Sequence, residues 1–418
     1  MFAQTPAPDY SGQAEGTAAE VQVAPPSGSG DAPLEVTAGE ATGAVNSDAG
    51  IIPDSPASPE NEAEDTAVGS ATPLRIEAGG TTIAQPGSVQ SSAPADAGGQ
   101  NAVININEGP VTVQVARGET QSTASTDGTT AATTNESTLA NAIIQGAASI
   151  PAGRGEADVS RTADGTVRAR GASAIDAPSS LAGGLITVQA ITASSQSVAN
   201  GITSNNVIDF LLTDLALRMT PDAEPVLRFN AGPAADPALV NVTVTIGGQA
   251  PITITVPRGT NLLDPSTYAG SDLDAVRLLL DPVLSGLIGP GGPLEGSELI
   301  IGGGFSEQGD GTFARGLVEV LRARVALANG SLVTAVLGRA FSGVDAVRAS
   351  SNVTNPRTPP GTPPATDAVN AFEPTRDATP AETIFTAPVV AAQNPDPGPE
   401  PEDDPVPESG DDDGEVVP

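Results

Sequence analysis

The sequence contains no cysteine, histidine, tryptophan or lysine, and only 2% of its 418 residues are aromatic. Without cysteine there is no disulfide bond and no thiolate metal site. Without histidine the usual nucleophilic triads cannot be assembled, and without lysine no Schiff base can form. Carboxylates are therefore the remaining groups for acid–base chemistry, and most catalytic motifs are excluded.

Long apolar runs are missing as well. No stretch of about 20 apolar residues is present, so we expect no transmembrane helix. Met1–Gln4 lacks the charged and apolar regions of a signal peptide, although these residues could be the last ones of a removed signal peptide. The net charge is −34 and all 17 basic residues are arginine. Such a charge repels nucleic acid, so we expect no nucleic-acid partner.

Glycine, proline and acidic residues are abundant and unevenly distributed. Residues 1–100 hold 14 acidic residues and one arginine, a net charge of −13, and residues 351–418 hold 14 acidic residues and two arginines, a net charge of −12. Segments of this kind bury too little apolar surface to offset the entropy of ordering. We therefore predict a mostly disordered N-terminal spacer over 1–100, a β domain over 101–350, and a disordered, acidic, proline-rich tail over 351–418.

The middle of the chain alternates apolar and polar residues as β-strands do. Val103–Asn107 and Val111–Val115 form one such pair, and Asn241–Ile246 and Pro251–Val256 form another around a Gly-Gly turn. Asn329-Gly330 predicts a tight turn in the last hairpin. Threonines occupy the alternate positions of the second pair, which predicts an antiparallel sheet with one solvated face.

The strand predicted over Val207–Arg218 places Leu211, Leu215 and Leu217 on one face and Asp214 on the other. In total the pattern predicts eight to eleven strands within about 250 residues, at intervals typical of sandwiches and barrels.

Two helices are predicted between the strands. Leu139–Ala147 follows a potential capping residue, Ser137, and is short. The second begins near Ser271, whose hydroxyl lies three residues before Asp274 as in a capping box, and Pro282 ends or kinks it. The fold class we predict is all-β: an antiparallel β-sandwich with one inserted short helix, flanked by disordered acidic Pro/Ala/Gly-rich segments.

Three segments resemble the choice-of-anchor P family of bacterial surface and secreted β proteins. They are the small-residue strand Gly184–Ser195, the leucine-rich segment Leu278–Leu284, and the strand pair of Leu321–Leu327 and Leu332–Gly343. The resemblance covers roughly residues 165–350. It implies a location outside the cytoplasm and no established enzymatic role, so it assigns no functional residue.

Candidate sites come from carboxylates and turns. Calcium requires only oxygen ligands, and Asp310, Glu307 and Asp164 are weak candidates because two of them lie in Asp-Gly-Thr segments. Glu307 with Asp310, or Asp272 with Asp274, could form a glycosidase pair, but sugar clefts usually contain stacking aromatic residues. Gly302–Gly304 lacks the lysine of a phosphate-binding loop, which favours a turn or bulge.

These observations predict a non-enzymatic, extracellular or cell-surface protein of a cell-envelope or adhesion type, whose partner is a cell-envelope or extracellular component. We expect no cofactor, with calcium as the possible exception. The alternatives are a calcium-dependent binding module and, less favoured, a carboxylate-based glycoside hydrolase.

Overall fold

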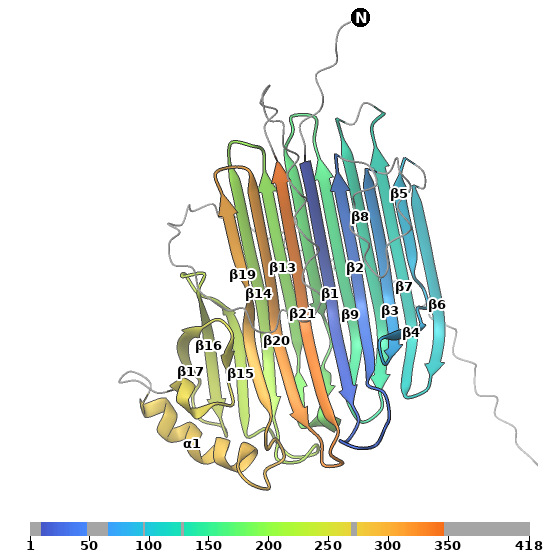
Figure 1. The fold of residues 1–418 in the computed structure, drawn as a ribbon. Coiled ribbons are helices and arrows are strands. Elements are labelled where there is room, and N and C mark those ends of the chain that lie inside the picture. The colour runs from blue at the N-terminus through green and yellow to red at the C-terminus, as the bar shows by residue number, and fades with distance from the viewer. Residues whose placement is uncertain (1–9, 48–65, 95–96, 127–128, 269–273, 347–418) are drawn as a thin grey trace, which may run out of the picture. The chain divides into compact units, whose positions relative to one another are not determined.

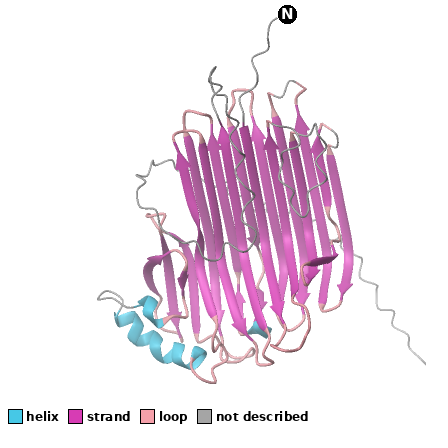
Figure 2. Ribbon diagram, viewed as in Figure 1, coloured by secondary structure: helices cyan, strands magenta, loops and turns pink. Residues whose placement is uncertain are grey.

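The computed structural model describes residues 10–47, 66–94, 97–126, 129–268 and 274–346. These residues form strands, two short 3-10 helices (Ala182–Gly184 and Pro265–Tyr268) and one α-helix, α1 (Asp274–Ile288). Figure 2 shows that strands dominate, which confirms the predicted all-β class. The strands are β1 Tyr10–Ala24, β2 Leu34–Asn46, β3 Ala67–Ala78, β4 Thr81–Ala84, β5 Val89–Ala93, β6 Gly98–Glu108, β7 Val111–Ala124, β8 Ala131–Ile144, β9 Ala148–Arg161, β10 Val167–Ile175, β11 Ser179–Leu181, β12 Ile186–Val188, β13 Ala190–Ala199, β14 Ser204–Leu217, β15 Leu227–Pro233, β16 Leu239–Ile246, β17 Ile252–Pro257, β18 Thr260–Asn261, β19 Glu298–Gly309, β20 Phe313–Ala326 and β21 Leu332–Ala346.

The strands form two antiparallel sheets that pack face to face (Figure 1). Sheet A has the order β18-β19-β20-β21-β1-β2-β3-β4, and β5 also pairs with β3. Sheet B runs β17-β16-β15-β14, then β13-β10 or the shorter β12-β11, then β9-β8-β7-β6. No helix in the described part of the chain has the length and apolar character needed to cross a membrane.

The N-terminal region corrects the predicted domain boundaries. β1 to β5, within residues 10–93, are strands of sheet A, and β1 pairs along its length with β21 at the other end of the described chain. The expectation of a spacer over residues 1–100 is therefore wrong for these residues. Their alanine, glycine, serine and threonine fit a closely packed interior that needs few large side chains. The tail predicted over 351–418 lies outside the described residues.

The structure contradicts the first of the two predicted helices and contains the second. Residues 139–147 are not helical: they belong to β8 and to the turn into β9, where Gly146 has φ 76°. The second helix is present as α1, which continues past Pro282 to Ile288, so Pro282 does not end it; the predicted start at Ser271 lies outside the described residues. The three hairpins predicted around residues 108–110, 247–250 and 328–331 are also confirmed, as β6–β7, β16–β17 and β20–β21.

One half of the sandwich, which we call the glycine half, brings the two sheets into backbone contact. A Cβ atom placed on Gly16 of β1 would lie 1.9 Å from the carbonyl oxygen of Ala172 on β10. One placed on Gly155 of β9 would lie 2.1 Å from the oxygen of Gly39, and one on Gly171 would lie 2.1 Å from that of Glu15. No side chain fits at these positions, so the sheets are closer here than side chains usually permit.

The remaining interior of the glycine half combines a cluster of mostly alanine and valine side chains with small polar side chains. Ser342 of β21 lies 2.7 Å and 2.8 Å, Oγ to Oγ, from Ser195 and Ser197 of β13, and all three are buried. Asn135 of β8 donates from Nδ2 to the Ala157 oxygen at 3.0 Å and to the Thr133 hydroxyl at 3.0 Å. These bonds satisfy hydroxyl and amide groups that would otherwise destabilise the interior.

The other half, the leucine half, has an interior of large apolar side chains. Leu74 of β3, Ile150 of β9 and Phe229 of β15 are fully buried there. α1 adds Leu280 and Leu284, which belong to the same apolar cluster. Burial of such side chains contributes roughly 1.5–3 kcal/mol each, so this half resembles an ordinary β-sandwich core.

A line of residues that we call the ladder break separates the halves in sheet A. At these residues the regular pairing skips one position on each of six neighbouring strands: Gly302, Val320, Gly338, Ala18, Gly39 and Pro73. Gly39, Gly302 and Gly338 have φ of 64°, 58° and 70°, which glycine adopts without strain. Because the alternation changes phase here, the consecutive residues Ala18 and Ala19 are both buried.

Sheet B has a matching break at Asn105, Gln114, Asn141 and Pro151 of β6 to β9. Asn105 and Asn141 have φ of 56° and 51°, values that asparagine tolerates better than most residues. In this sheet two consecutive residues, Gln114 and Val115, face solvent. At their breaks both sheets are therefore displaced in the same direction, and they remain in contact.

A separate bulge in β14 explains an error in the predicted faces of this strand. Asp214 has φ 49°, and the register of β14 with β15 shifts between Leu212 and Leu215. As a result Leu215 is buried and Leu211 is exposed, so the expectation that they share a face is wrong. A strict period of two fails wherever a bulge adds a residue.

Candidate functional site

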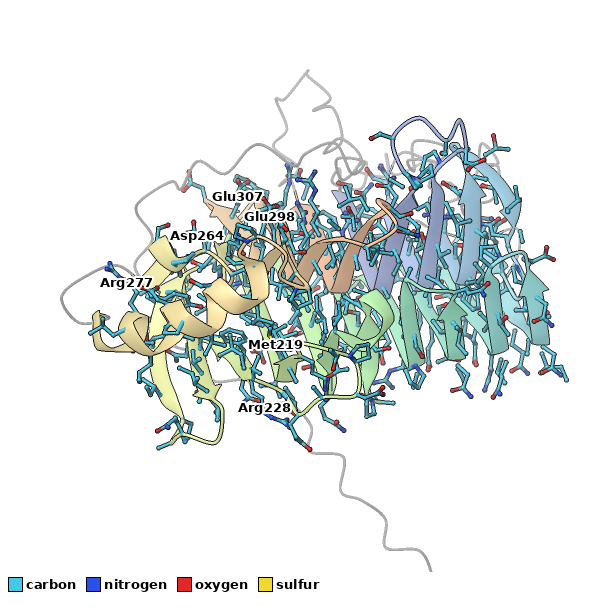
Figure 3. The ribbon with its side chains drawn as sticks, turned by 90° about the horizontal axis from the view of Figure 1, so that it is seen from below. Met219, Arg228, Asp264, Arg277, Glu298 and Glu307 are labelled. Carbon is cyan, nitrogen blue, oxygen red and sulfur yellow. The ribbon has the colours of Figure 1, made fainter. Side chains whose placement is uncertain are left out.

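The structure places the three calcium candidates on two different sheets. Glu307 lies on β19 and Asp310 in the turn that follows, whereas Asp164 lies in the turn between β9 and β10. Figure 3 shows Glu307 on the outer face of sheet A, on the side opposite to Arg228 of sheet B. In the described ranges no group of three or more acidic, histidine or cysteine residues is arranged to hold a metal ion.

Asp164 has a local role in its turn. Its Oδ1 accepts a hydrogen bond of 2.6 Å from the Thr162 hydroxyl and one of 3.1 Å from the Thr166 amide. These bonds, led by the one from Thr162, lower the pKa of the exposed Asp164 carboxyl. The carboxylate thus stabilises the turn, and the calcium assignment for Asp164, Glu307 and Asp310 stays a prediction. Of the alternative carboxylate pair, Asp272 lies outside the described residues.

The most unusual ionisable groups lie on the outer face of sheet A beside the ladder break. We call them the charged cluster: Glu15, Glu20, Glu40, Arg75 and Arg339, from β1, β2, β3 and β21. Arg339 lies 3.6 Å from Glu15 and 3.7 Å from Glu20. Arg75 lies 3.6 Å from Glu40 and also 3.6 Å from Glu77. Arg339 therefore joins β21 to β1, and Arg75 joins β3 to β2.

The change in inward–outward alternation at the ladder break brings these charged residues together. Thr17 and Glu20 are successive outward residues of β1, because Ala18 and Ala19 both face the core. Thr17 is in register with Arg339 and with Glu40 on its two sides. The outward-facing residues on the two sides of the ladder break therefore lie close together, and they form the charged cluster.

Burial changes the ionisation of Glu40 markedly. The side chain is only 10% exposed, and desolvation raises the pKa of Glu40 to about 7, although the positive charge of Arg75 opposes the rise. Burial also raises the pKa of Glu20, which Arg339 partly counteracts. Glu15 is the main cause of a raised pKa at Arg339. Glu40 is therefore a group that takes up a proton near neutral pH.

Some buried polar atoms at the charged cluster make no hydrogen bond to the described residues. Glu40 Oε2 and the hydroxyls of Ser70 and Thr72 are buried without a hydrogen-bond partner among the described residues. Thr72 is in register with Glu40. Strongly perturbed groups of this kind occur at functional sites and also in structural ion-pair networks. Here the ion pairs link two pairs of neighbouring strands, β21 with β1 and β2 with β3, which is an arrangement that joins strands.

Sequence reasoning missed the charged cluster because it placed these acidic residues in a spacer. A signal was present: Leu34-Glu-Val-Thr-Ala38 and Arg75-Ile-Glu77 alternate in the manner of strands. The high acid content and the small neighbours outweighed that signal.

The outer face of sheet B is a wide polar surface. One row in register across five strands, which we call the polar row, consists of Gln121, Thr134, Asp158, Arg170 and Gln196. All five are exposed or partly exposed. Arg170 binds Asp158 at 3.2 Å and Glu156 at 2.7 Å. The row presents donors and acceptors at the spacing of adjacent strands, about 4.8 Å.

Comparison with known proteins gives little guidance. No family model matches the chain, and no curated protein matches it in sequence. Among solved structures, the translocator domain of autotransporter NalP from Neisseria meningitidis is 8% identical, over 81% of this chain and 88% of that one, with a TM-score of 0.14. A similarity at that TM-score carries no argument about fold or function.

Proposed function

We propose that this protein is a non-enzymatic, extracytoplasmic protein of a cell-envelope or adhesion type, which meets a cell-envelope or extracellular component through the outer face of sheet B. The observation that carries the proposal is the polar row. Its residues come from five strands, lie in one register and are accessible to a partner. The resemblance to the choice-of-anchor P family points in the same direction.

A flat sheet face suits an extended partner better than a small molecule. Small ligands usually bind in concave pockets that enclose most of their surface. A polar polymer, in contrast, can contact several strands at once, each through a hydrogen bond of modest strength. The net charge of −34 favours solubility and discourages contact with nucleic acid and anionic lipid.

Location can be tested directly in cells that make the protein. We expect a tagged chain in the medium or the envelope fraction, and we expect protease added to intact cells to remove the envelope-bound form. Recovery of the tagged chain only in the cytoplasmic fraction, with a cytoplasmic marker, would contradict the proposal.

Binding can be tested by co-sedimentation with two probes, isolated cell-wall sacculi and extracellular polysaccharide from the same cells. We expect a Thr134→Glu, Gln196→Glu double variant to lose at least tenfold in binding, because two charges are added to the polar row. The matched control is Thr243→Glu, Thr253→Glu, on β16 and β17 of the same sheet but outside the row. Equal binding by both double variants would exclude the polar row as the contact surface.

A further inference from the structure

Two rows of outward-facing residues border the ladder break on sheet A. Each row takes one residue from each of the neighbouring strands β19, β20, β21, β1, β2 and β3. The row on the side of the glycine half is, in that order, Gly303, Glu319, Arg339, Thr17, Glu40 and Thr72. The row on the side of the leucine half is Ile300, Arg322, Val336, Glu20, Thr37 and Arg75.

The charges of these two rows are complementary. Along the strands the first row carries an acidic, a basic and an acidic residue, and the second carries a basic, an acidic and a basic residue. Each charge has its partner on the other side of the break, and we call the three ion pairs the bridging pairs. Their nitrogen-to-oxygen distances are 2.6 Å for Arg322–Glu319, 3.7 Å for Arg339–Glu20 and 3.6 Å for Arg75–Glu40.

The break of sheet B has no equivalent in the described part of the chain. The ion pairs of Arg117, Arg154 and Arg170 with their acidic partners all lie on the glycine-half side of that break. At the break itself the Asn141 amide donates to Gln114, and both residues belong to the break. Charges therefore connect the two halves across the outer face of sheet A and not across that of sheet B.

The ladder break is also the line at which sheet A can open most easily. Regular pairing omits one residue on each of its six strands. The inward residues next to the break on β1 and β2 are Ala19 and Ala38, which are paired in register and are small. Local opening requires little free energy where backbone hydrogen bonds and apolar contacts are few. The bridging pairs act at such a place.

We propose that a proton controls local opening of the ladder break: the break stays closed while Glu40 is protonated, and it opens between β1, β2 and β3 when Glu40 is ionised. Glu40 is 8% exposed, and its Oε2 has no hydrogen-bond partner. The hydroxyls of Ser70 and Thr72 beside it are likewise buried and unpartnered. An ionised carboxylate here lacks the solvation that it gains when the break opens.

The charged groups that face Glu40 come from three strands. Glu15 and Glu20 of β1 disfavour its negative charge, whereas Arg75 of β3 and Arg339 of β21 favour it. Desolvation outweighs the arginines and raises the pKa of Glu40 from 4.5 to about 7. In the opened state the carboxyl is solvated and its pKa returns towards 4.5. The closed state therefore binds the proton more tightly, and the opened population rises about tenfold between pH 6 and pH 8.

Arg75 keeps other partners when Glu40 is neutral. Its guanidinium lies 3.6 Å from Glu77 on the same strand and donates a hydrogen bond of 3.2 Å to the Thr37 hydroxyl. Protonation of Glu40 thus removes a buried charge without leaving Arg75 unpaired. The pair of Arg322 and Glu319 on β20 does not involve Glu40, so control by the proton is confined to the β1, β2 and β3 side of the break.

The first test is hydrogen–deuterium exchange of the full chain at pH 6 and pH 8. Each rate is divided by the rate of an unstructured peptide at the same pH, so that the ordinary pH dependence of exchange cancels. We expect protection of residues 15–23, 35–42 and 70–77 to fall about tenfold from pH 6 to pH 8. Val167–Ile175 and Ala190–Ala199 of sheet B should change less than about twofold. Unchanged protection beside the break, or an equal fall in both sheets, would overturn the proposal.

The same measurement on two variants assigns the proton. Glu40→Gln carries a neutral side chain of nearly the same shape, so protection beside the break should be the same at pH 6 and pH 8. The matched control is Glu136→Gln, at an exposed residue of sheet B, and it should keep the fall of the parent. A fall in Glu40→Gln as large as that of the parent would show that another group controls the opening.

A further pair of variants tests the bridging pairs without altering Glu40. Arg322→Gln removes the ion pair with Glu319, and we expect roughly threefold lower protection of residues 317–323 at both pH values. The control is Arg324→Gln, at the next outward residue of β20, which is exposed and forms no ion pair among the described residues. Equal protection in Arg322→Gln and Arg324→Gln would contradict the role of the bridging pairs in keeping the break closed.

Discussion

The glycine half and the leucine half of the sandwich fill the same space in different ways. In the glycine half the backbones of the two sheets touch at Gly16, Gly155 and Gly171, and hydroxyl groups hydrogen-bond between the sheets. In the leucine half, large side chains such as Phe229 separate the sheets and exclude water. The comparison teaches that a β-sandwich can be built with few bulky residues, provided that most inward positions are small. It also predicts opposite sensitivities to substitution.

The largest effect is expected from a bulky side chain in the glycine half. Gly16→Val would place atoms within 2 Å of the Ala172 oxygen, and the neighbouring groups are backbone that cannot rotate away. We expect more than about 5 kcal/mol of destabilisation, seen as loss of soluble, folded protein by circular dichroism. Gly99→Val, where no atom lies within 4 Å of the added Cβ, should fold normally. Normal folding of both variants would remove the contrast between the halves.

Truncation of a core side chain of the leucine half should cost more than truncation of a small inward side chain of the glycine half. Phe229→Ala leaves a cavity among fully buried neighbours and should lower the free energy of unfolding by about 3–5 kcal/mol. Ala169→Gly in the glycine half removes one methyl group and should cost about 1 kcal/mol. Chemical denaturation of both variants measures the difference, and equal losses would mean that the two interiors are packed alike.

The buried amide of Asn135 tests the polar part of the glycine half. Asn135→Ala removes its hydrogen bonds to Thr133 and Ala157 and leaves their oxygens buried, so we expect a loss of about 2 kcal/mol in the free energy of unfolding. Asn205→Ala, at an exposed residue of β14, is the control and should change stability by less than about 0.5 kcal/mol. A neutral Asn135→Ala would show that these bonds contribute nothing.

The charged cluster should make stability depend on pH through Glu40. Burial raises the pKa of Glu40 from 4.5 to about 7, so protonation favours the folded state. The stabilisation from this group is complete below pH 4.5 and is lost as the pH rises through about 7. We expect Glu40→Gln to remove this dependence and to raise the free energy of unfolding at pH 8 by about 2 kcal/mol.

The control for that titration is Glu136→Gln, on the exposed outer face of sheet B. Denaturation curves at pH 5 and pH 8 for the two variants and the parent give the comparison. If Glu40→Gln follows the parent at both values, Glu40 is ionised normally and the charged cluster is solvated.

The leucine half was largely predictable from the sequence, and the glycine half was not. Regular alternation, such as Val242, Val244 and Ile246 on β16, predicted strands and faces that the structure confirms. Residues 10–46 contain acidic residues and small neighbours in place of that apolar pattern. Backbone contact between sheets stabilises them, and a residue-by-residue pattern does not reveal such contact. For the same reason the charged cluster was missed.

Irregular residues inside the strands were the second feature that the sequence did not reveal. Asn105, Asn141 and Asp214 have positive φ values, and each changes the inward–outward phase of its strand. A single residue with positive φ inside an alternating segment cannot be recognised from the sequence before the pairing with the neighbouring strands is known. The polar row was not anticipated, because the threonines expected to face outward lie on β16 and β17, outside the row, and the alignment of the row over five strands depends on register.

The most direct test of backbone contact in the glycine half is the free energy of unfolding of Gly155→Ala beside that of Gly232→Ala. The added methyl group would lie 2.1 Å from the Gly39 oxygen in the first variant, and no closer than 3.7 Å to any neighbour in the second. We expect a loss of at least about 3 kcal/mol for Gly155→Ala, and a change below about 1 kcal/mol for Gly232→Ala. Equal values for the two variants would contradict contact between the sheets.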